Sequence, residues 1–186
     1  MSQAYEKSYY TYADFLEWDE SERCELVDGE IVMLGAPTSD HQHLVMELAY
    51  QIRRFLEGKS CQVFPAPFDV RLHPAEDDSD DTVFEPDIVV ICDPSKIEKR
   101  GCKGAPDLII EIMSPSSARY DRVVKFRRYQ QAGVREYWIA DPETKSVQAC
   151  ILENGHYTVT MYDDTNTAPV SVLPGCTIDL TTVFAE

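Results

Sequence analysis

The sequence lacks the hydrophobic segments that direct a chain to or across a membrane. No apolar run approaches the roughly 20 residues needed to span a bilayer. The first residues, MSQAYEKSYY, contain no apolar stretch of the secretory type, so we expect no signal peptide.

Paired cysteine motifs are missing as well. Six cysteines are scattered along the chain without a CxxC pair, which argues against a zinc ribbon and against a dense disulfide framework. We therefore expect a reduced, cytoplasmic protein in which the cysteines are core residues.

Basic residues are few. The chain has 17 Lys and Arg against 33 Asp and Glu, a formal net charge of -16, whereas a simple electrostatic nucleic-acid binder is basic. The sequence also contains no GxSxG, no glycine-rich phosphate loop and no catalytic Cys/His arrangement. These absences exclude several common enzyme classes.

The charges are distributed unevenly. Residues 76–87 carry seven acids and no base, and we interpret 76–81 as a solvated, mobile loop. Residues 119–135 carry six basic side chains against one acid, Asp121. A local basic segment in an acidic chain suggests a polyanionic ligand.

The order of predicted elements indicates a single α/β domain covering residues 1–186, with a mixed sheet. Helices are predicted at 11–20, 38–58 and 116–133, hairpins around Asp28-Gly29 and Asn154-Gly155, buried strands at 85–94, 105–115 and 135–142, and shorter strands within 61–74. The expected helix caps are Thr11, Ser39 or Asp40, and Ser116 or Ser117, with Gly58 and Gly133 ending the second and third helices.

An acidic residue interrupts one of the buried strands. Glu111 follows Leu-Ile-Ile in "DLIIEIM", and Asp87 opens the strand "DIVVI". If the two strands are neighbours, the carboxylates repel each other and require a cation, for which a divalent metal ion with oxygen ligands is suited. On the following helix Asp121, Lys125 and Tyr129 are spaced four apart, so Lys125 could reach Glu111.

Each of these residues also has a purely structural interpretation. Asp87 could be a turn residue, Glu111 could pair with Arg122 or Arg128 in a structural ion pair, and Lys125 could be a surface lysine.

Three segments, "EPDIVVI", "APDLIIEIMSPSSARYDRVVKFRRYQQAG" and "VREYWIADP", resemble the Uma-two family of endonucleases, a branch of the PD-(D/E)XK, restriction-endonuclease-like superfamily. "CELVDGEIVML" and "DHQHLVMEL" extend the resemblance over nearly the whole chain. It implies a restriction-endonuclease-like core, with a central mixed sheet flanked by helices and a β-hairpin or meander added at the C-terminus.

The resemblance also implies a site and a reaction. Asp87 and Glu111 match the family's two acids, and they would bind Mg²⁺ or Mn²⁺ together with the carbonyl of Ile112. The chain departs from the superfamily at Met113, where lysine is usual, and Lys125 is the candidate for a migrated lysine. The implied activity is hydrolysis of phosphodiester bonds, in DNA rather than RNA, by a homodimer.

Other residues are secondary candidates. His41 matches a histidine at a helix start in the family, and a supporting role is considered for His41, Glu47, Asp121 and Glu25, and nucleic-acid contacts for Arg122, Arg127 and Arg128. Two alternatives remain open: an interaction module that has lost catalysis, with Met113 as the sign of decay, and a hydrolase of another phosphodiester. A distance beyond about 8 Å between the Lys125 amine and Glu111 would favour the decayed module.

Overall fold

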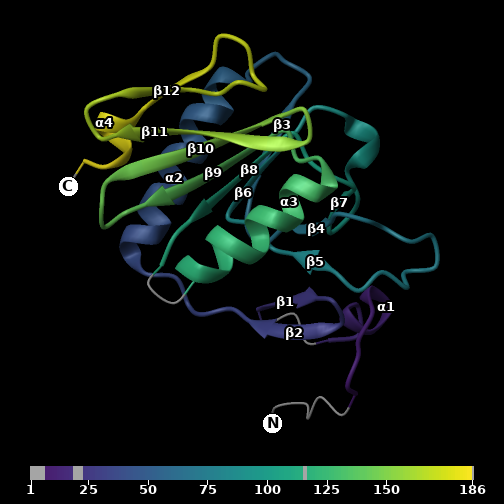
Figure 1. Ribbon diagram of the computed structural model, residues 1–186. Coiled ribbons are helices and arrows are strands. Elements are labelled where there is room, and N and C mark those ends of the chain that lie inside the picture. Colours follow the sequence, from purple (N-terminus) through teal and green to yellow (C-terminus); the bar gives the residue numbers. More distant parts are fainter. Residues whose placement is uncertain (1–6, 19–22, 115–116, 186) are drawn as a thin grey trace.

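A mixed sheet of six strands forms the centre of the molecule, as the computed structural model shows (Figure 1). The structure describes residues 7–18, 23–114 and 117–185. The strand order is β11-β10-β9-β8-β6-β3, and only β8 and β9 run parallel. The bounds are β3 Gln62–Pro65, β6 Ile88–Ile91, β8 Leu108–Ile112, β9 Glu136–Asp141, β10 Ser146–Glu153 and β11 His156–Asp163.

The three strands expected to be buried, β6, β8 and β9, are adjacent and central. All their residues are buried, as near-continuous apolar runs predict. The connection from β8 to β9 contains a π-helix, η2 (Tyr120–Lys125), and an α-helix, α3 (Phe126–Ala132). Gly133, with φ 85°, ends α3 as expected.

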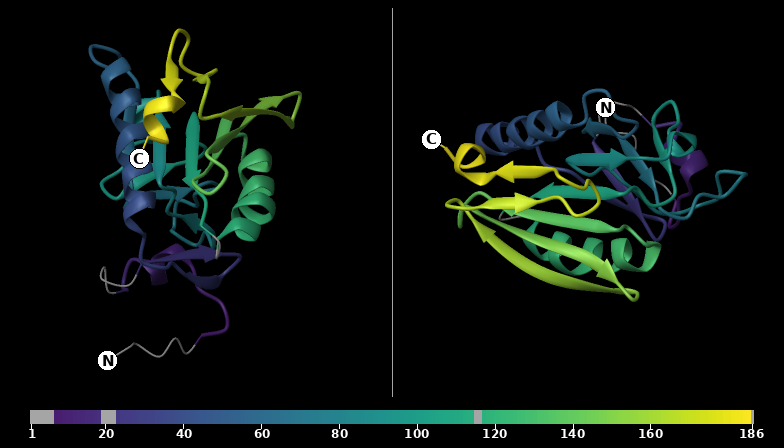
Figure 2. Two further views of the ribbon diagram at one scale, coloured as in Figure 1. Left: turned by 90° about the vertical axis from the view of Figure 1, so that its left-hand side faces the viewer. Right: turned by 90° about the horizontal axis from the view of Figure 1, so that it is seen from above.

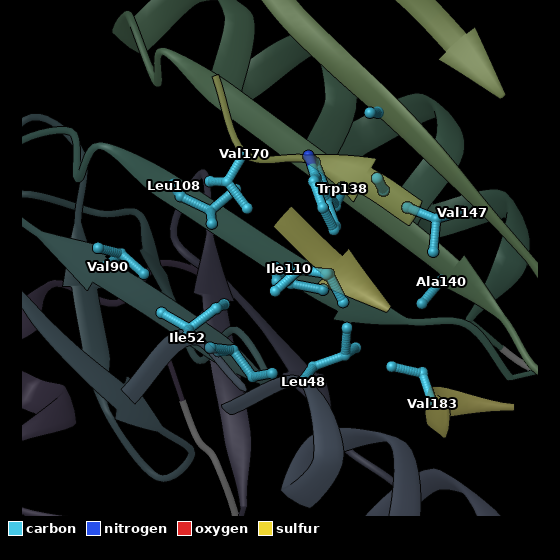
Figure 3. Close-up of a cluster of buried hydrophobic side chains, with 14 of the residues drawn as sticks. Leu48, Ile52, Val90, Leu108, Ile110, Trp138, Ala140, Val147, Val170 and Val183 are labelled. Atoms are coloured by element: carbon cyan, nitrogen blue, oxygen red, sulfur yellow. The ribbon is translucent and has the colours of Figure 1, made fainter. Parts of the chain in front are cut away.

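Two helices cover opposite faces of this sheet (Figure 2). Helix α2 (Ser39–Phe55) packs with Leu48 and Ile52 against Val90, Leu108 and Ile110 (Figure 3). On the other face Tyr129 of α3 packs among the alternate residues of the same strands. The predicted α/β class with helices flanking a central sheet is confirmed.

A smaller sheet lies beside one end of the central sheet (Figure 1). Its order is β2-β1-β5-β4-β7, and the hairpin of β1 and β2 turns at Asp28 and Gly29, both with positive φ. The bounds are α1 Tyr12–Phe15, β1 Cys24–Val27, β2 Glu30–Met33, β4 Asp69–Arg71, β5 Val83–Phe84, the 3₁₀ turn η1 Pro94–Lys96 and β7 Gly101–Lys103.

The C-terminal part adds the expected hairpin of β10 and β11 around Asn154-Gly155 and a short closing unit. That unit comprises β12 Thr167–Pro169, β13 Thr177–Asp179 and α4 Leu180–Val183. Among the described residues, no helix has the length and apolarity required to cross a membrane.

The expectation of six unpaired cysteines is wrong for two of them. Cys61 and Cys92 form a disulfide, while the other four cysteines are free and buried. The antiparallel pairing of Gln62 with Ile91 explains this, because it brings the preceding Cys61 directly opposite Cys92.

Two helix starts differ from the prediction. The side chain that caps α2 is Thr38, which accepts a hydrogen bond from the His41 amide, and not Ser39 or Asp40. η2 follows Arg119, whose side chain makes no capping hydrogen bond, so Ser117 does not cap it; the Ser117 amide instead donates to the Ser114 hydroxyl at 3.2 Å. The alternative cap Ser116 lies outside the described residues.

The acidic run at 76–81 is more than a solvated loop. Arg71, only 3% exposed, binds Asp80 at 2.5 Å and Asp78 at 2.8 Å. The carbonyls of Asp78 and Asp80 also accept hydrogen bonds from the backbone of α1. Ion pairs with the buried Arg71 therefore hold part of the acidic loop in place.

Candidate active site

Asp87 and Glu111 lie side by side at one end of the central strands. In the antiparallel pair of β6 and β8, Ile88 is opposite Ile110, so the register places Asp87 opposite Glu111. Asp87 Oδ2 accepts a hydrogen bond from the Ile112 amide at 2.8 Å. The two strands are therefore neighbours, and the two carboxylates lie close together, as the sequence suggested for neighbouring strands.

Glu111 is buried and held by two donors from the crossover. Lys125 Nζ lies 2.8 Å from Glu111 Oε1, and the Tyr129 hydroxyl donates to the same oxygen at 2.9 Å. The lysine therefore reaches Glu111, far inside the 8 Å limit. Glu111 Oε1 accepts both of these hydrogen bonds, whereas Glu111 Oε2 accepts none from the residues that the structure describes.

Lys125 is also bound by a second glutamate, Glu25 of β1. Its Nζ lies 2.9 Å from Glu25 Oε1 and 3.9 Å from Asp121 Oδ1. Glu25 is in turn held by the Tyr120 hydroxyl at 2.8 Å and the Glu85 amide at 3.0 Å. Glu25, expected only to support the site, is therefore a direct partner of the lysine.

The π-helical geometry of η2 helps to collect these groups. The Phe126 amide bonds to the Asp121 carbonyl, five residues earlier, as in a π-helix. This spacing puts Tyr120 and Lys125, five residues apart, on one side, where both contact Glu25. Single π-helical turns of this kind are often found at functional sites.

The buried cluster carries more acid than base. Glu25, Glu111, Asp121 and Lys125 are each at most 4% exposed, so three carboxylates surround one ammonium group. Burial raises the pKa of Glu111 well above its usual range, Lys125 opposes this rise, and Asp87 adds to it. Burial likewise raises the pKa of Asp121.

The lysine remains a cation in this environment. Burial alone would lower the pKa of Lys125, but Glu111, Glu25 and Asp121 together raise it well above its ordinary value. Lys125 is therefore an electrostatic group and a hydrogen-bond donor, and it is poorly suited to accept a proton.

His41, in the first turn of α2, contacts the other acid. Its Nε2 lies 3.2 Å from Asp87 Oδ2. Its buried Nδ1 has no hydrogen-bond partner within the part of the chain that the structure describes. The helix-start histidine is thus adjacent to the carboxylate pair.

A cavity of about 840 Å³ opens onto these groups. Met113 also lines it, directly after the end of β8 and two residues beyond Glu111, where a lysine would complete the usual pattern. The polar and charged residues that line it are Arg23, Thr38, Asp40, His41, Glu85, Asp87, Glu111, Ser114, Ser117, Tyr120, Asp121, Lys125 and Glu143.

The donors present suit a hard divalent cation. Asp87 and Glu111 each have one carboxylate oxygen without a hydrogen bond from a described residue, and the cluster has surplus negative charge. In the described ranges, no group of three or more His, Cys, Asp and Glu side chains is arranged to hold a metal ion. A metal held here would need backbone or substrate oxygens as further ligands.

The remaining candidates lie outside the cavity. Glu47 of α2 does not line it, and neither do the three arginines expected to contact nucleic acid, Arg122, Arg127 and Arg128. Arg122 is exposed and 3.5 Å from Asp141, and Arg128 pairs with Asp28 at the hairpin turn. Arg127 is exposed on α3.

Sequence reasoning missed two contributors to the site. Tyr120 has no motif that marks it, since its role depends on the π-helical spacing. Arg23 pairs with Glu85 at 2.5 Å on the cavity wall, and the only signal in sequence is the position of Glu85 two residues before Asp87.

Comparison with family models finds one family that covers most of the chain. A family model named Uma2 and described as "Putative restriction endonuclease" matches residues 12–181.

Two relatives from Synechocystis sp. carry no functional description. The uncharacterized protein slr1290 is 28% identical over 118 residues, which are 62% of this chain and 60% of that protein. The uncharacterized protein sll1609 is 29% identical over 136 residues, 70% of this chain and 74% of that protein. The chain thus aligns with only part of each relative.

A solved structure shares the fold. The crystal structure of a putative nuclease of the DUF820 group from Anabaena variabilis superposes with a TM-score of 0.75 at 21% identity, covering 95% of this chain and 98% of that one. The restriction-endonuclease-like fold expected from the sequence is therefore confirmed.

Proposed function

The chain belongs to the Uma2 family of restriction-endonuclease-like proteins, and on that premise we propose that it is a divalent-metal-dependent endonuclease that hydrolyses phosphodiester bonds of DNA. The structurally similar protein from Anabaena variabilis, described as a putative nuclease, supports the same class of activity through its shared fold. Mg²⁺ is the proposed ion, with Mn²⁺ as a substitute.

The observation that carries the proposal is the contact between Lys125 Nζ and Glu111 Oε1 at 2.8 Å, beside Asp87 on the neighbouring strand. Two acids and a lysine thus come together although Met113 occupies the usual lysine position. A chain that had lost catalysis could replace the whole buried cluster of acids and lysine by apolar residues, because a buried ion pair adds little net stability over well-packed apolar side chains.

Asp87, Glu111 and the Ile112 carbonyl would hold the metal. When bound, the ion supplies a Lewis acid for the phosphate and lowers the pKa of a coordinated water. The remaining work belongs to the side chains of the protein.

Lys125 provides positive charge where negative charge develops in the transition state. Its raised pKa keeps the ammonium group protonated, so it donates a hydrogen bond to a phosphate oxygen or to the attacking water and does not act as a base. Glu25 and Tyr129 orient the site: Glu25 binds the Lys125 amine, and the Tyr129 hydroxyl fixes one oxygen of Glu111. His41 positions Asp87 in the same way.

A plasmid-nicking assay with Mg²⁺ or Mn²⁺ tests this proposal. Asp87→Asn keeps the shape of the side chain and an acceptor for the Ile112 amide, but loses the charge, so it should abolish metal-dependent nicking. The matched control is Asp107→Asn. Asp107 also follows a proline at the start of a central strand and is similarly buried, with side-chain exposures of 12% for Asp107 and 13% for Asp87.

The two outcomes separate nuclease from interaction module. Loss of nicking in Asp87→Asn, with activity retained in Asp107→Asn, supports the proposal. Absence of nicking by the wild type with either ion would instead favour the decayed module, in agreement with Met113 in the cavity. A homodimer that cuts both strands and a cytoplasmic location remain predictions.

A further inference from the structure

A second cavity lies on the other side of Asp87. Its volume is about 690 Å³. We call it the flanking pocket, defined by its lining residues Phe15, Trp18, Arg23, Cys24, Gln42, Val45, Ala66, Pro67, Asp69, Glu85, Asp87, Lys99 and Arg100. Its lining comes from α1, the N-terminal half of α2, two strands of the small sheet and the segments between them.

The flanking pocket and the cavity at Glu111 share a wall. Arg23, Glu85 and Asp87 line both. A nucleic-acid strand whose phosphate is at Asp87 would therefore have its next nucleotide beside the flanking pocket.

Aromatic rings form one side of the flanking pocket. The rings of Phe15 and Trp18 are 5.2 Å apart and tilted by 57°, and the Arg100 guanidinium lies 5.8 Å from the Phe15 ring. Flat aromatic and guanidinium surfaces are what single-strand binding proteins use to stack nucleobases.

Three basic side chains line the flanking pocket, together with the same number of acidic ones. Arg23, Lys99 and Arg100 all line the pocket, and Lys99 is exposed. Arg23 is held by Glu85 at 2.5 Å, and Arg100 by Asp69 at 3.3 Å, so both arginines have fixed positions. Such a group can contact phosphates on either side of a bound base.

The flanking pocket also contains a buried acceptor, Asp69. Asp69 is 7% exposed, and its Oδ2 forms an ion pair with Arg100 Nε at 3.3 Å without a well-aligned hydrogen bond from a described residue. A carboxylate oxygen accepts more than one hydrogen bond, so Oδ2 can take a further donor from a ligand beside Arg100. An exocyclic amino group of a nucleobase is such a donor.

We propose that the flanking pocket binds an unpaired nucleotide of the strand that is cut, next to the cleaved phosphate. Its base would stack on Phe15 and Trp18 and donate an amino hydrogen to Asp69, while Lys99 and the arginines contact its phosphates. This rests on the proposed nuclease function and narrows the substrate to DNA with a single-stranded segment at the cleavage point. A paired base cannot enter, because its neighbours cover its faces and its partner covers its edge.

Tryptophan fluorescence tests binding independently of cleavage. The chain has two tryptophans, and Trp138 is fully buried in the central core, so a base entering the flanking pocket should quench Trp18. The probe is a tetranucleotide of deoxycytidine, titrated in EDTA so that no metal-dependent cutting occurs. A tetranucleotide with abasic sugars and a blunt duplex are the reference ligands.

The expected result is quenching by the tetranucleotide, with affinity about tenfold or more above that of the abasic ligand, and no quenching by the duplex. Equal affinity for the abasic ligand, or quenching by the duplex alone, would overturn the proposal.

Two substitutions sharpen the test. Phe15→Leu should weaken tetranucleotide binding about tenfold and leave the abasic ligand unaffected. Because Phe15 is buried, Lys99→Ala serves as an exposed alternative that should weaken both oligonucleotides several-fold, and Lys103→Ala, an exposed residue nearby that does not line the pocket, is its control. Equal effects of the two lysine variants would count against the proposal.

The failures of the two proposals are distinguishable. Plasmid nicking without tetranucleotide binding would refute only the flanking pocket as a nucleotide site. Tetranucleotide binding without nicking would refute the nuclease while leaving the nucleotide site in place.

Discussion

At the scale of single residues, the clearest feature is a buried lysine in the core. Lys125 is 3% exposed and lies among Glu25, Glu111 and Asp121. Its interpretation as a surface lysine is therefore wrong. Charge in such a place is tolerated only because the partners are charged as well.

We predict that Lys125→Ala lowers both activity and stability. The rate of nicking should fall by about 10²–10³, the typical cost of losing one transition-state donor. The free energy of unfolding should fall by about 3 kcal/mol near neutral pH, because three carboxylates lose their cation. Urea unfolding and the nicking assay measure the two effects, with the exposed Arg122→Ala as the control for stability.

The stability loss in Lys125→Ala should shrink on acidification, since the pKa values of Glu111 and Asp121 are already raised and protonation removes their repulsion. An unfolding free energy equal to that of the wild type at neutral pH would show that Lys125 is not buried in solution.

Asp69 provides a second prediction at this scale. Burial raises the pKa of Asp69 to about 6, well above the usual range of an aspartate, with Arg100 opposing the rise. The folded protein thus binds the proton of Asp69 more tightly than the unfolded chain does. The free energy of unfolding therefore falls as the pH rises from about 4 to about 6, and it stays lower at higher pH.

Asp69→Asn removes this cost. The stability of the variant relative to the wild type should therefore be greater near pH 7.5 than near pH 5, by about 1 to 2 kcal/mol. Urea unfolding at the two pH values measures the difference. A relative stability independent of pH would show that the carboxyl has an ordinary pKa.

At the scale of elements, the site depends on which segment supplies the lysine. The usual pattern has it on the strand, two residues after the second acid, whereas here η2 supplies Lys125, and Met113 occupies the position directly after β8. Both positions face the same cavity. A lysine from either backbone origin could therefore reach the same phosphate.

Met113→Lys combined with Lys125→Ala should recover part of the nicking activity that Lys125→Ala loses. Met113 is only partly buried and lines the cavity, so an amine there can retain contact with water, although the apolar neighbours limit the recovery. Met113→Leu with Lys125→Ala is the matched control and should recover nothing. Equal activities of the two double variants would disprove that a lysine at position 113 can replace Lys125.

At the scale of the whole molecule, the disulfide joins β3, at one edge of the central sheet, to β6. The cross-link spans 31 residues of sequence, a loop whose closure restricts the unfolded chain.

Reduction should therefore lower the melting temperature. Loop closure of this length stabilises the folded state by about 3 to 4 kcal/mol, which is the loss of free energy of unfolding expected on reduction. Thermal unfolding with and without dithiothreitol measures this, and the Cys61→Ser, Cys92→Ser double variant should be insensitive to the reductant. A wild type that is equally insensitive would mean that its two cysteines are unpaired in solution, as the sequence first suggested.

The net charge of -16 is also a property of the whole molecule. Part of the acidic charge lies in ion pairs with the buried bases Arg71 and Lys125, and the flanking pocket is lined by three bases and three acids. Beside Asp87, three carboxylates surround one ammonium group, so a bound divalent cation would have to offset this negative charge before a phosphate approaches.

The sequence by itself determined the elements whose signals are local. The three central strands could be predicted because their residues are apolar on both faces, and the two hairpins because Asp-Gly and Asn-Gly adopt positive φ easily. The two acids stood out for a related reason, since a carboxylate within a buried strand needs a compensating partner.

Only the tertiary structure decided which of these residues meet. The opposition of Asp87 and Glu111 depends on strand order and register, and so does the pairing of Cys61 with Cys92. Glu25 and Asp69 acquire their partners from segments far away in the chain. A sequence pattern reports the preferences of neighbouring residues, whereas side-chain contacts across a sheet depend on the packing of the whole domain.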